Sequence, residues 1–309
     1  MRFQKKLDGA QTVAVVDTSF GDSGKGSITD WLASMKDNNG NILFRHVYRA
    51  NGGPNTGHTI YVNGNKTVFH LIPSAALNMG VNCYIGRAVA FEPKTFLMEL
   101  DRVKQYNPEP RIIIDYGAPV IMPWHIAIDN LREAAKGKEK IGTTGKGVGP
   151  CMETMASRNG FVIVETLTNK EELRKRVNEA INRFQPEIKH LINKLKEYQE
   201  IDSYLANIKL QLNGNLGIYF NNEELNAEKI IEDYTKHGEI SSNYNSRTVL
   251  STVSSEMLEF EEIKNIKGVK KFEELPENAQ KYLETIEQLT NSEILIIGNG
   301  TDRNDKIVR

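Results

Sequence analysis

The chain has 309 residues, 39% of them hydrophobic, which suffices for a substantial buried core. Its 39 Lys and Arg residues nearly balance its 40 Asp and Glu residues, so no overall positive charge favours binding to nucleic acid or anionic lipid. No apolar run approaches the roughly 18 residues of a membrane span, and the polar start lacks the apolar core of a secretion signal. We therefore predict a globular cytoplasmic protein without nucleic-acid or membrane partners.

The two cysteines, Cys83 and Cys151, lie far apart in the sequence. They lack the spacing of a metal site or of a redox pair. We predict two reduced thiols in an intracellular protein, packed in its core.

The first half of the chain alternates short β-branched runs with helical patterns. A buried strand is predicted at residues 13–16, followed by a glycine-rich turn and a helix over residues 27–35. The later candidates are strands at residues 67–72, 111–114 and 161–164, and helices at about residues 93–105 and 124–136. This order predicts an α/β fold with a mostly parallel central sheet and flanking helices.

The second half has a different pattern. Residues 169–208 are rich in Lys and Glu, with apolar residues at intervals of three and four, which predicts a helical insertion. Residues 211–247 are dense in Asn and Ser and predict a flexible segment. A helix at about residues 276–289 and a strand at residues 293–297 follow. We thus predict one domain over residues 1–309 that carries this insertion and this flexible segment.

The strongest local signal is the run Gly21-Asp22-Ser23-Gly24-Lys25-Gly26, which follows the first predicted strand. Glycines let backbone N–H groups approach phosphate oxygens, the following helix adds partial positive charge, and Lys25 adds a full charge. The spacing differs from the ordinary phosphate-binding loop, because Gly26 stands where Ser or Thr is expected. Asp22 would repel phosphate unless it holds a metal or acts as a base, so it indicates chemistry. A merely structural turn is the alternative.

Two further glycine-rich polar loops follow. The run Asn51-Gly52-Gly53-Pro54-Asn55-Thr56-Gly57-His58-Thr59 contains a potential proton donor in His58, with an unperturbed pKa of about 6.5. By itself it is also compatible with a turn around a hydrogen-bonded histidine. Residues 141–150 offer hydroxyls, flexible amides and Lys146, as a generic anion-binding loop does. Three such loops in half a chain predict a nucleotide site assembled across strand ends.

Together these runs resemble adenylosuccinate synthetases. The matching runs, in the family's order and spacing, are residues 21–26, 52–59, 69–74 and 141–150. The similarity extends from about Thr12 to Leu167 and returns at residues 273–276 and 300–303, which is well over half the chain. The resemblance implies a C–N ligase that phosphorylates the 6-oxo group of IMP with GTP and Mg²⁺. The amine of L-aspartate then displaces that phosphate to give adenylosuccinate.

The resemblance also implies roles for individual residues. Asp22 matches the base that takes the N1 proton and ligates Mg²⁺, and His58 matches the acid that stabilises the transferring phosphoryl group. The backbone of Gly57 completes the metal shell. The residues that match the phosphate-binding loop are Gly21, Ser23, Gly24, Lys25 and Gly26.

The acceptor nucleotide is assigned three residues in the same way. Asn55 helps to hold the purine nucleotide, and Thr144 holds its monophosphate. Arg158 matches an arginine that the family donates across a dimer interface to the neighbouring subunit's nucleotide. The resemblance therefore implies a homodimer.

The chain departs from the family where it is shorter, between the helical insertion and the C-terminal block. The family's aspartate-binding loops are not found there, which puts aspartate in doubt. The family reads guanine with a Thr-Lys-x-Asp segment, and residues 252–255, Thr-Val-Ser-Ser, align with it. Without that carboxylate, the preference for guanine should be lost, and ATP or dATP becomes a candidate donor.

Three functions therefore stay open. The first is the IMP ligase. The second is the same reaction on dGMP, with ATP or dATP as donor, as in the shorter phage-type aminoadenylosuccinate synthetases. Asp22 favours IMP over dGMP, because the phage enzymes carry Ser at that position. Ser23, which replaces the family's usual Glu, keeps dGMP open as the acceptor. The third is a nucleotide-binding sensor or regulator that has lost aspartate ligation.

Overall fold

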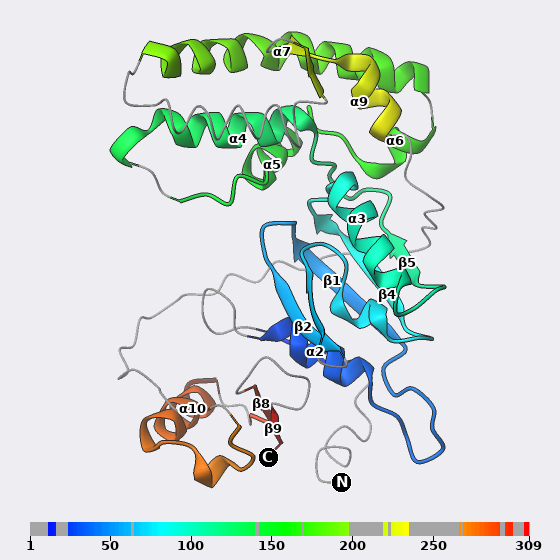
Figure 1. Ribbon diagram of the computed structural model, residues 1–309, viewed down its shortest axis with the longest axis vertical. Helices are drawn as coiled ribbons and strands as arrows, with labels where there is room; N and C mark the ends of the chain where they lie inside the picture. The colour runs from blue at the N-terminus through cyan, green and yellow to red at the C-terminus, as the bar shows by residue number, and fades with distance from the viewer. Residues whose placement is uncertain are drawn as a thin grey trace. The chain divides into compact units, whose positions relative to one another are not determined.

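The structure of the protein is a computed structural model (Figure 1). It describes residues 12–16, 24–62, 65–139, 142–168, 170–197, 219–221, 224–234, 266, 268–290, 294–298 and 306–308. The described residues form two compact units. The first is drawn from Met1–Arg45, Gly57–Phe69 and Asn245–Arg309, and the second from His46–Thr56 and His70–Tyr244. The chain therefore leaves the second unit after Thr56 and returns to it at His70.

A helix and a hairpin form the N-terminal part of the first unit. Helix α2 (Lys25–Ala33) begins directly after Gly24, whose φ of 80° lies in the left-handed region that glycine adopts without strain. Strands β2 (His58–Val62) and β3 (Asn65–Phe69) pair in antiparallel fashion, and α2 packs against β2. The sequence of β2, HTIYV, is rich in the β-branched and aromatic residues that favour strands.

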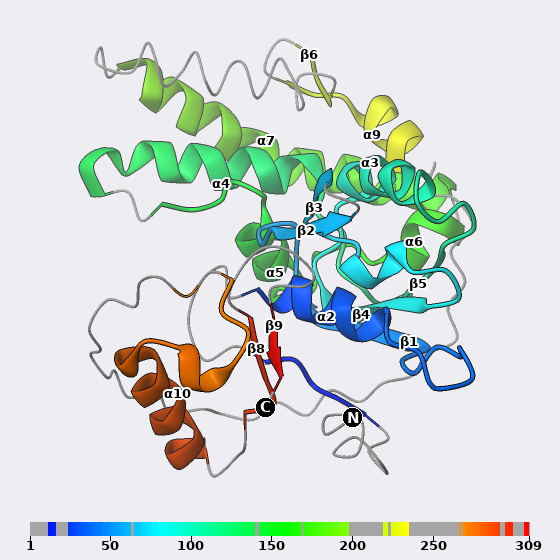
Figure 2. The ribbon, with the colours of Figure 1, turned by 60° about the horizontal axis from the view of Figure 1, so that its bottom comes forward.

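The C-terminal part of the first unit consists of a short helical turn, a helix and two strands. These elements are η5 (Phe272–Glu274), α10 (Glu277–Thr290), β8 (Ile296–Gly298) and β9 (Lys306–Val308). The two strands pair in antiparallel fashion, as Figure 2 shows. The buried apolar residues of this part are Phe272, Leu275, Ala279 and Ile307. Lys306 Nζ donates to Ser27 Oγ over 3.0 Å, which joins β9 to α2 within the unit.

The second unit contains a parallel sheet of order β1-β4-β5. Its strands are β1 (His46–Gly52), β4 (Asn82–Val89) and β5 (Arg111–Ile114). A 3-10 turn, η1 (Ser74–Leu77), precedes β4, and helix α3 (Pro93–Lys104) connects β4 to β5. Glu92 begins α3 by accepting hydrogen bonds from the N–H groups of Lys94 (3.1 Å) and Thr95 (2.6 Å). Such a cap satisfies amides that have no partner inside the helix.

Helices form the rest of the second unit (Figure 1). They are α4 (Pro123–Ala135), η2 (Gly137–Glu139), α5 (Val148–Ala156), α6 (Ile163–Thr168), α7 (Lys170–Glu197) and α9 (Ala227–Tyr234). The long α7 packs against α4 and α9. A two-residue pair of strands, β6 (Phe220–Asn221) and β7 (Glu224–Leu225), precedes α9. The fully buried Trp124 stacks on Phe184 of α7, with ring centroids 5.9 Å apart, and anchors this layer.

The predicted fold class is confirmed, since a parallel sheet is flanked by helices. Strand β5 has the predicted bounds, and helices α3 and α4 lie within one residue of the predicted ones. The predicted strand at residues 161–164 is wrong, because α6 starts at Ile163. There the Glu165 carboxylate accepts the Val162 N–H over 2.9 Å, which favours a helix start over a strand.

Two other strand predictions also need correction. Residues 13–16 form no strand; Val16 is 78% exposed, and nothing among the described residues pairs with them. The strand predicted at residues 67–72 ends at Phe69 and belongs to the hairpin, not to the parallel sheet. Beyond that residue, side chains instead of a neighbouring strand take the backbone hydrogen bonds of residues 70–72.

The two predictions for the middle of the chain fall partly on described residues. Helix α7 occupies the first part of the predicted insertion, and residues 198–208 lie outside the described residues. Within the stretch expected to be flexible, the described residues form β6, β7 and α9, and Ile230 and Tyr234 are buried. The apolar spacing of this helix was hidden in a segment rich in Asn and Ser.

Candidate functional site

The phosphate-binding loop is described only at its end. Gly21, Asp22 and Ser23 lie outside the described residues, whereas Gly24 and Lys25 form the junction with α2. Glycine is needed at position 24 because of its left-handed backbone. The N-terminus of α2, with its partial positive charge, directly follows the loop. The described end of this segment is thus a left-handed glycine followed by a helix N-terminus, and its anion-binding role stays a prediction.

Gly26 and His58 come together within the first unit. A Cβ atom added at Gly26 would lie 2.8 Å from His58 Cβ and 3.3 Å from His58 Cγ. His58 is the first residue of β2, half-buried, and its position is fixed by the packing of α2 on this strand. Two residues that are 32 positions apart, and that belong to separate predicted motifs, are thus neighbours. The glycine at position 26 lets the histidine come this close to the end of the predicted phosphate-binding loop.

The second and third glycine-rich loops meet within the second unit. A Cβ atom added at Gly53 would lie 2.9 Å from Val148 Cγ2 and 3.3 Å from Ala90 Cβ. Gly53 and Pro54 are buried, while the Asn55 side chain is exposed. The loop that carries Asn55 therefore rests on the first residue of α5, directly after the loop that carries Thr144.

Side chains of α4 hold the third loop in place. Gly147, with φ of 74°, caps α5 and donates its N–H to Asp129 Oδ2 over 2.8 Å. Asn130 Nδ2 donates to the Gly145 carbonyl over 2.9 Å. Thr144 itself is exposed. The exposed Thr144 hydroxyl therefore belongs to a loop whose backbone is held by side chains of α4. It lies just before the N-terminus of α5, and a helix N-terminus favours an anion.

Arg158 follows the last turn of α5, and its side chain is exposed. Arg158 has a φ of 62°, and among the described residues it is the one residue other than glycine with a positive φ. The N–H groups of Arg158 and Asn159 donate to the carbonyls of Met155 (3.1 Å) and Thr154 (2.8 Å). Two backbone hydrogen bonds thus hold the chain at Arg158 in a left-handed conformation at the end of α5.

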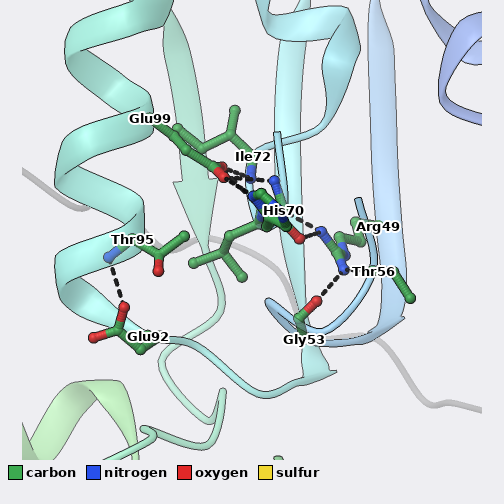
Figure 3. Close-up of polar contacts among 9 residues, drawn as sticks. Arg49, Gly53, Thr56, His70, Ile72, Glu92, Thr95 and Glu99 are labelled. Carbon is green, nitrogen blue, oxygen red and sulfur yellow. Dashed lines mark hydrogen bonds and ion pairs between the residues drawn. The ribbon is translucent and has the colours of Figure 1, made fainter. Parts of the chain in front are cut away.

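A polar network formed by the half-buried Arg49 and the buried Glu99 lies beside the second loop and was not predicted from the sequence (Figure 3). Arg49 of β1 donates to carbonyl oxygens of His70 (2.6 Å), Leu71 (2.8 Å) and Gly53 (2.7 Å). Glu99 of α3, only 2% exposed, accepts N–H groups from the same stretch around Leu71. One signal was available in the sequence: Glu99 shares the buried face of α3 with Phe96 and Val103, where an apolar residue is expected.

The described residues contain no group of three His, Cys, Asp or Glu side chains that could hold a metal ion. Of the two predicted metal ligands, Gly57 is exposed and Asp22 lies outside the described residues. Both cysteines are free and buried, as predicted, and burial raises the pKa of each thiol to about 12. Among the described helices, none is both long and apolar enough to cross a bilayer.

Comparison with known proteins identifies the relatives. The family model for adenylosuccinate synthetase matches residues 14–231 and 221–307. The chain is 44% identical over 158 residues to adenylosuccinate synthetase 2 of Chromobacterium violaceum, covering 50% of this chain and 35% of that protein. It is 43% identical over 182 residues to the adenylosuccinate synthetase of an Anaeromyxobacter species, covering 58% and 40%. The chain thus matches less than half the length of these relatives.

A solved structure extends the similarity to the whole fold. It is the fully ligated adenylosuccinate synthetase of Plasmodium falciparum, with a TM-score of 0.60 and 20% identity. The match covers 94% of this chain and 97% of that chain. At this identity the match shows a shared fold.

Proposed function

Since the chain belongs to the adenylosuccinate synthetase family, we propose that it is a purine nucleotide ligase acting on IMP. It phosphorylates the 6-oxo group and then displaces that phosphate with the amine of L-aspartate, which forms adenylosuccinate. The observation that carries this proposal is the approach of Gly26 to His58. This proximity supports a role for His58 as a proton donor to a phosphoryl group held by the proposed phosphate-binding loop.

The proposed roles of the two catalytic residues follow from the chemistry. Asp22 takes the proton from N1 of the purine, which makes O6 a nucleophile towards the γ-phosphorus of the donor. His58 donates a hydrogen bond to the phosphoryl group as negative charge develops on it. In the second step, the phosphate is a far better leaving group than the original oxygen, and the amine displaces it.

The phosphates of the donor are assigned to the loop itself. Lys25 and the backbone amides of Gly21, Ser23, Gly24 and Gly26 supply the positive charge and the hydrogen bonds. Mg²⁺ would be held by the Asp22 carboxylate and the Gly57 carbonyl, which are the oxygen donors that this ion prefers. When bound, it neutralises charge on the phosphate oxygens.

The acceptor nucleotide is assigned to the second unit. Asn55 and Thr144 lie on the two loops that meet where Gly53 approaches Val148, which supports a shared role. We assign Arg158 to the nucleotide of a second copy of the chain in a homodimer; its exposed side chain, at the end of α5, supports this assignment. A strictly monomeric protein in sedimentation experiments would exclude that role.

The donor is proposed to be ATP or dATP at least as readily as GTP. Residues 252–255 align with the guanine-reading segment of the family and supply no carboxylate. They lie outside the described residues. A site without such an acceptor loses the hydrogen bonds by which guanine is distinguished.

One matrix of assays tests these proposals. IMP and dGMP are each combined with GTP, ATP or dATP, with and without L-aspartate, and phosphate release and products are measured. Phosphate release from IMP that requires aspartate, with adenylosuccinate as product, is the expected result. His58→Asn should lower kcat by about 10²-fold while changing the acceptor KM little.

The other outcomes separate the alternatives. Turnover of dGMP in preference to IMP would indicate the aminoadenylosuccinate reaction. Because the chain matches less than half of its curated relatives, nucleotide binding without turnover would instead indicate a sensor or regulator. Binding of no purine nucleotide would refute the proposal as a whole.

A further inference from the structure

Arg49 forms an unusually complete set of hydrogen bonds near the end of β1 (Figure 3). Besides the three carbonyl oxygens already described, it donates to the Thr56 hydroxyl (3.3 Å) and, through Nε, to the Asn51 carbonyl (3.4 Å). A guanidinium carries five N–H donors in a fixed plane. Five acceptors on two separate chain segments are therefore held by one rigid group.

The two segments are the ones that lead into and out of the β2–β3 hairpin. Residues 51–56 precede His58, the first residue of β2, and residues 70–71 follow Phe69, the last residue of β3. His58 and Phe69 face each other in the antiparallel pair. Arg49 therefore ties together the chain on both sides of the hairpin that carries His58.

Glu99 supports the second of these segments from the other side. Its carboxylate accepts the N–H groups of His70 (2.5 Å), Leu71 (3.0 Å) and Ile72 (2.8 Å). The peptide groups of this stretch thus donate to a carboxylate and offer their carbonyls to a guanidinium. The hydrogen bonds from the N–H groups to the carboxylate polarise these peptide groups, which strengthens the hydrogen bonds from the guanidinium to their carbonyls, and the reverse holds as well.

The charge of Arg49 persists at neutral pH. Burial lowers the pKa of Arg49 to about 10, and the nearby Glu99 acts in the opposite direction. A charged group is held at this position although burial disfavours it. An apolar side chain could fill the same space, but it could not order a loop through the carbonyls of that loop.

We propose that Arg49, supported by Glu99, is a positioning residue for the proposed ligase. It holds residues 53–56, and with them Asn55, in the geometry that the acceptor nucleotide requires. This inference rests on the proposed function. It deepens that function, because Arg49 itself touches neither nucleotide and acts through the loop.

Matched variants test this role. Arg49→Lys keeps the positive charge but replaces the planar fork by a single nitrogen, which cannot reach five acceptors. Thr56→Val removes one acceptor at nearly constant shape, and Thr56→Ser keeps the hydroxyl. Arg174→Lys is the control, because Arg174 forms an exposed ion pair with Glu228 on a distant helix surface.

Two measurements are made on each full-length variant. Hydrogen exchange of the unliganded protein reports on the amides of residues 55–58, with α7 as internal reference. Steady-state kinetics with IMP report acceptor KM and kcat separately. Arg49→Lys should speed exchange at residues 55–58 by about tenfold or more, with α7 unchanged, and should raise acceptor KM by about tenfold. Thr56→Val should show a smaller effect of the same kind, and Thr56→Ser and Arg174→Lys should behave like wild type.

The outcomes distinguish this inference from the proposed function. If Arg49→Lys lowers thermal stability but leaves exchange at residues 55–58 and acceptor KM unchanged, Arg49 is merely structural and the inference is overturned. If exchange rises without a change in KM, the loop is held but its order does not matter for the acceptor, which also overturns it. If wild type binds no purine monophosphate, the proposed function fails, while the exchange data still decide whether Arg49 orders the loop.

Discussion

The surroundings of His125 in the helical layer and the network around Arg49 satisfy polar groups in opposite ways, although both belong to the second unit. In the helical layer, Trp124 stacks on Phe184, and His125 is buried at 1% exposure. Burial lowers the pKa of His125 to about 3, so the imidazole is neutral. Beside the loops, Arg49 keeps its charge, and both Arg49 and Glu99 are hydrogen-bonded to backbone groups. The packing around Trp124 thus holds a buried imidazole uncharged, whereas the network around Arg49 uses a charged guanidinium to order a loop.

His125 shows how the helical layer satisfies a polar group without charge. Its Nδ1 accepts the Met122 N–H over 3.1 Å, and its Nε2 lies 3.2 Å from Thr154 Oγ1. Since the threonine hydroxyl donates to the Cys151 carbonyl over 2.7 Å, it accepts from Nε2–H. These partners assign the neutral tautomer with its proton on Nε2. Both ring nitrogens are satisfied while the side chain stays uncharged.

The largest expected effect comes from breaking the helical layer at its centre. Trp124→Ala removes a fully buried ring that packs on Phe161 and Phe184, and should destabilise the fold by about 3–5 kcal/mol in urea unfolding. Trp124→Phe should cost much less, because an aromatic ring is retained. Exchange at residues 55–58 should not change in molecules that stay folded. If it rises as in Arg49→Lys, the two regions are coupled and the comparison fails.

A smaller effect is expected from pH. The pKa of His125 is depressed on folding, so between pH 6.5 and about 3 the unfolded chain binds a proton that the folded chain does not. Stability is therefore complete above pH 6.5 and falls as pH falls, by up to about 1.4 kcal/mol per unit. At about pH 5, wild type should have lost about 2 kcal/mol more than His125→Asn, each relative to its own value at about pH 7.5. Equal losses in urea titrations of the two proteins would show that His125 does not titrate in this way.

The smallest effect is expected where the two loops meet. Gly53→Ala puts a methyl group 2.9 Å from Val148 Cγ2, so one of the loops must shift. We expect a loss of about 1 kcal/mol in stability and a several-fold increase in acceptor KM. Gly149→Ala is the control, because a Cβ atom there meets nothing within 4 Å. Equal acceptor KM values for the two variants would show that the contact does not position the loops.

Much of the scaffold could be predicted from the sequence, because its elements follow local patterns. The apolar spacing and the early prolines mark α3 and α4, and a continuous β-branched run marks β5. The same reasoning failed at residues 161–164, where a β-branched run forms the start of a helix. There the Glu165 carboxylate and contacts with residues 116–118 outweigh the local preference for a strand.

The site was predictable in composition but not in assembly. The glycine-rich loops identify Lys25 and His58 as candidates, and the resemblance to adenylosuccinate synthetases adds Asn55 and Thr144. No pattern in the chain indicates that Gly26 would lie beside His58. The network around Arg49 was not foreseen, because most of its hydrogen-bond partners are backbone atoms and backbone atoms leave no trace in the sequence. One sign of this network was detectable in the sequence, because Glu99 puts a carboxylate on the otherwise apolar face of α3.

The pairing of His58 with Phe69 brings the two ends of the β2–β3 hairpin next to each other. Since its two ends are neighbours, the segment between them can lengthen, shorten or be exchanged while β1, β4 and β5 keep their register. Such a segment can diverge at a different pace from the sheet that supports it. A chain assembled in this way can vary the hairpin between its two neighbouring ends while the strands that precede and follow it in the sequence are retained.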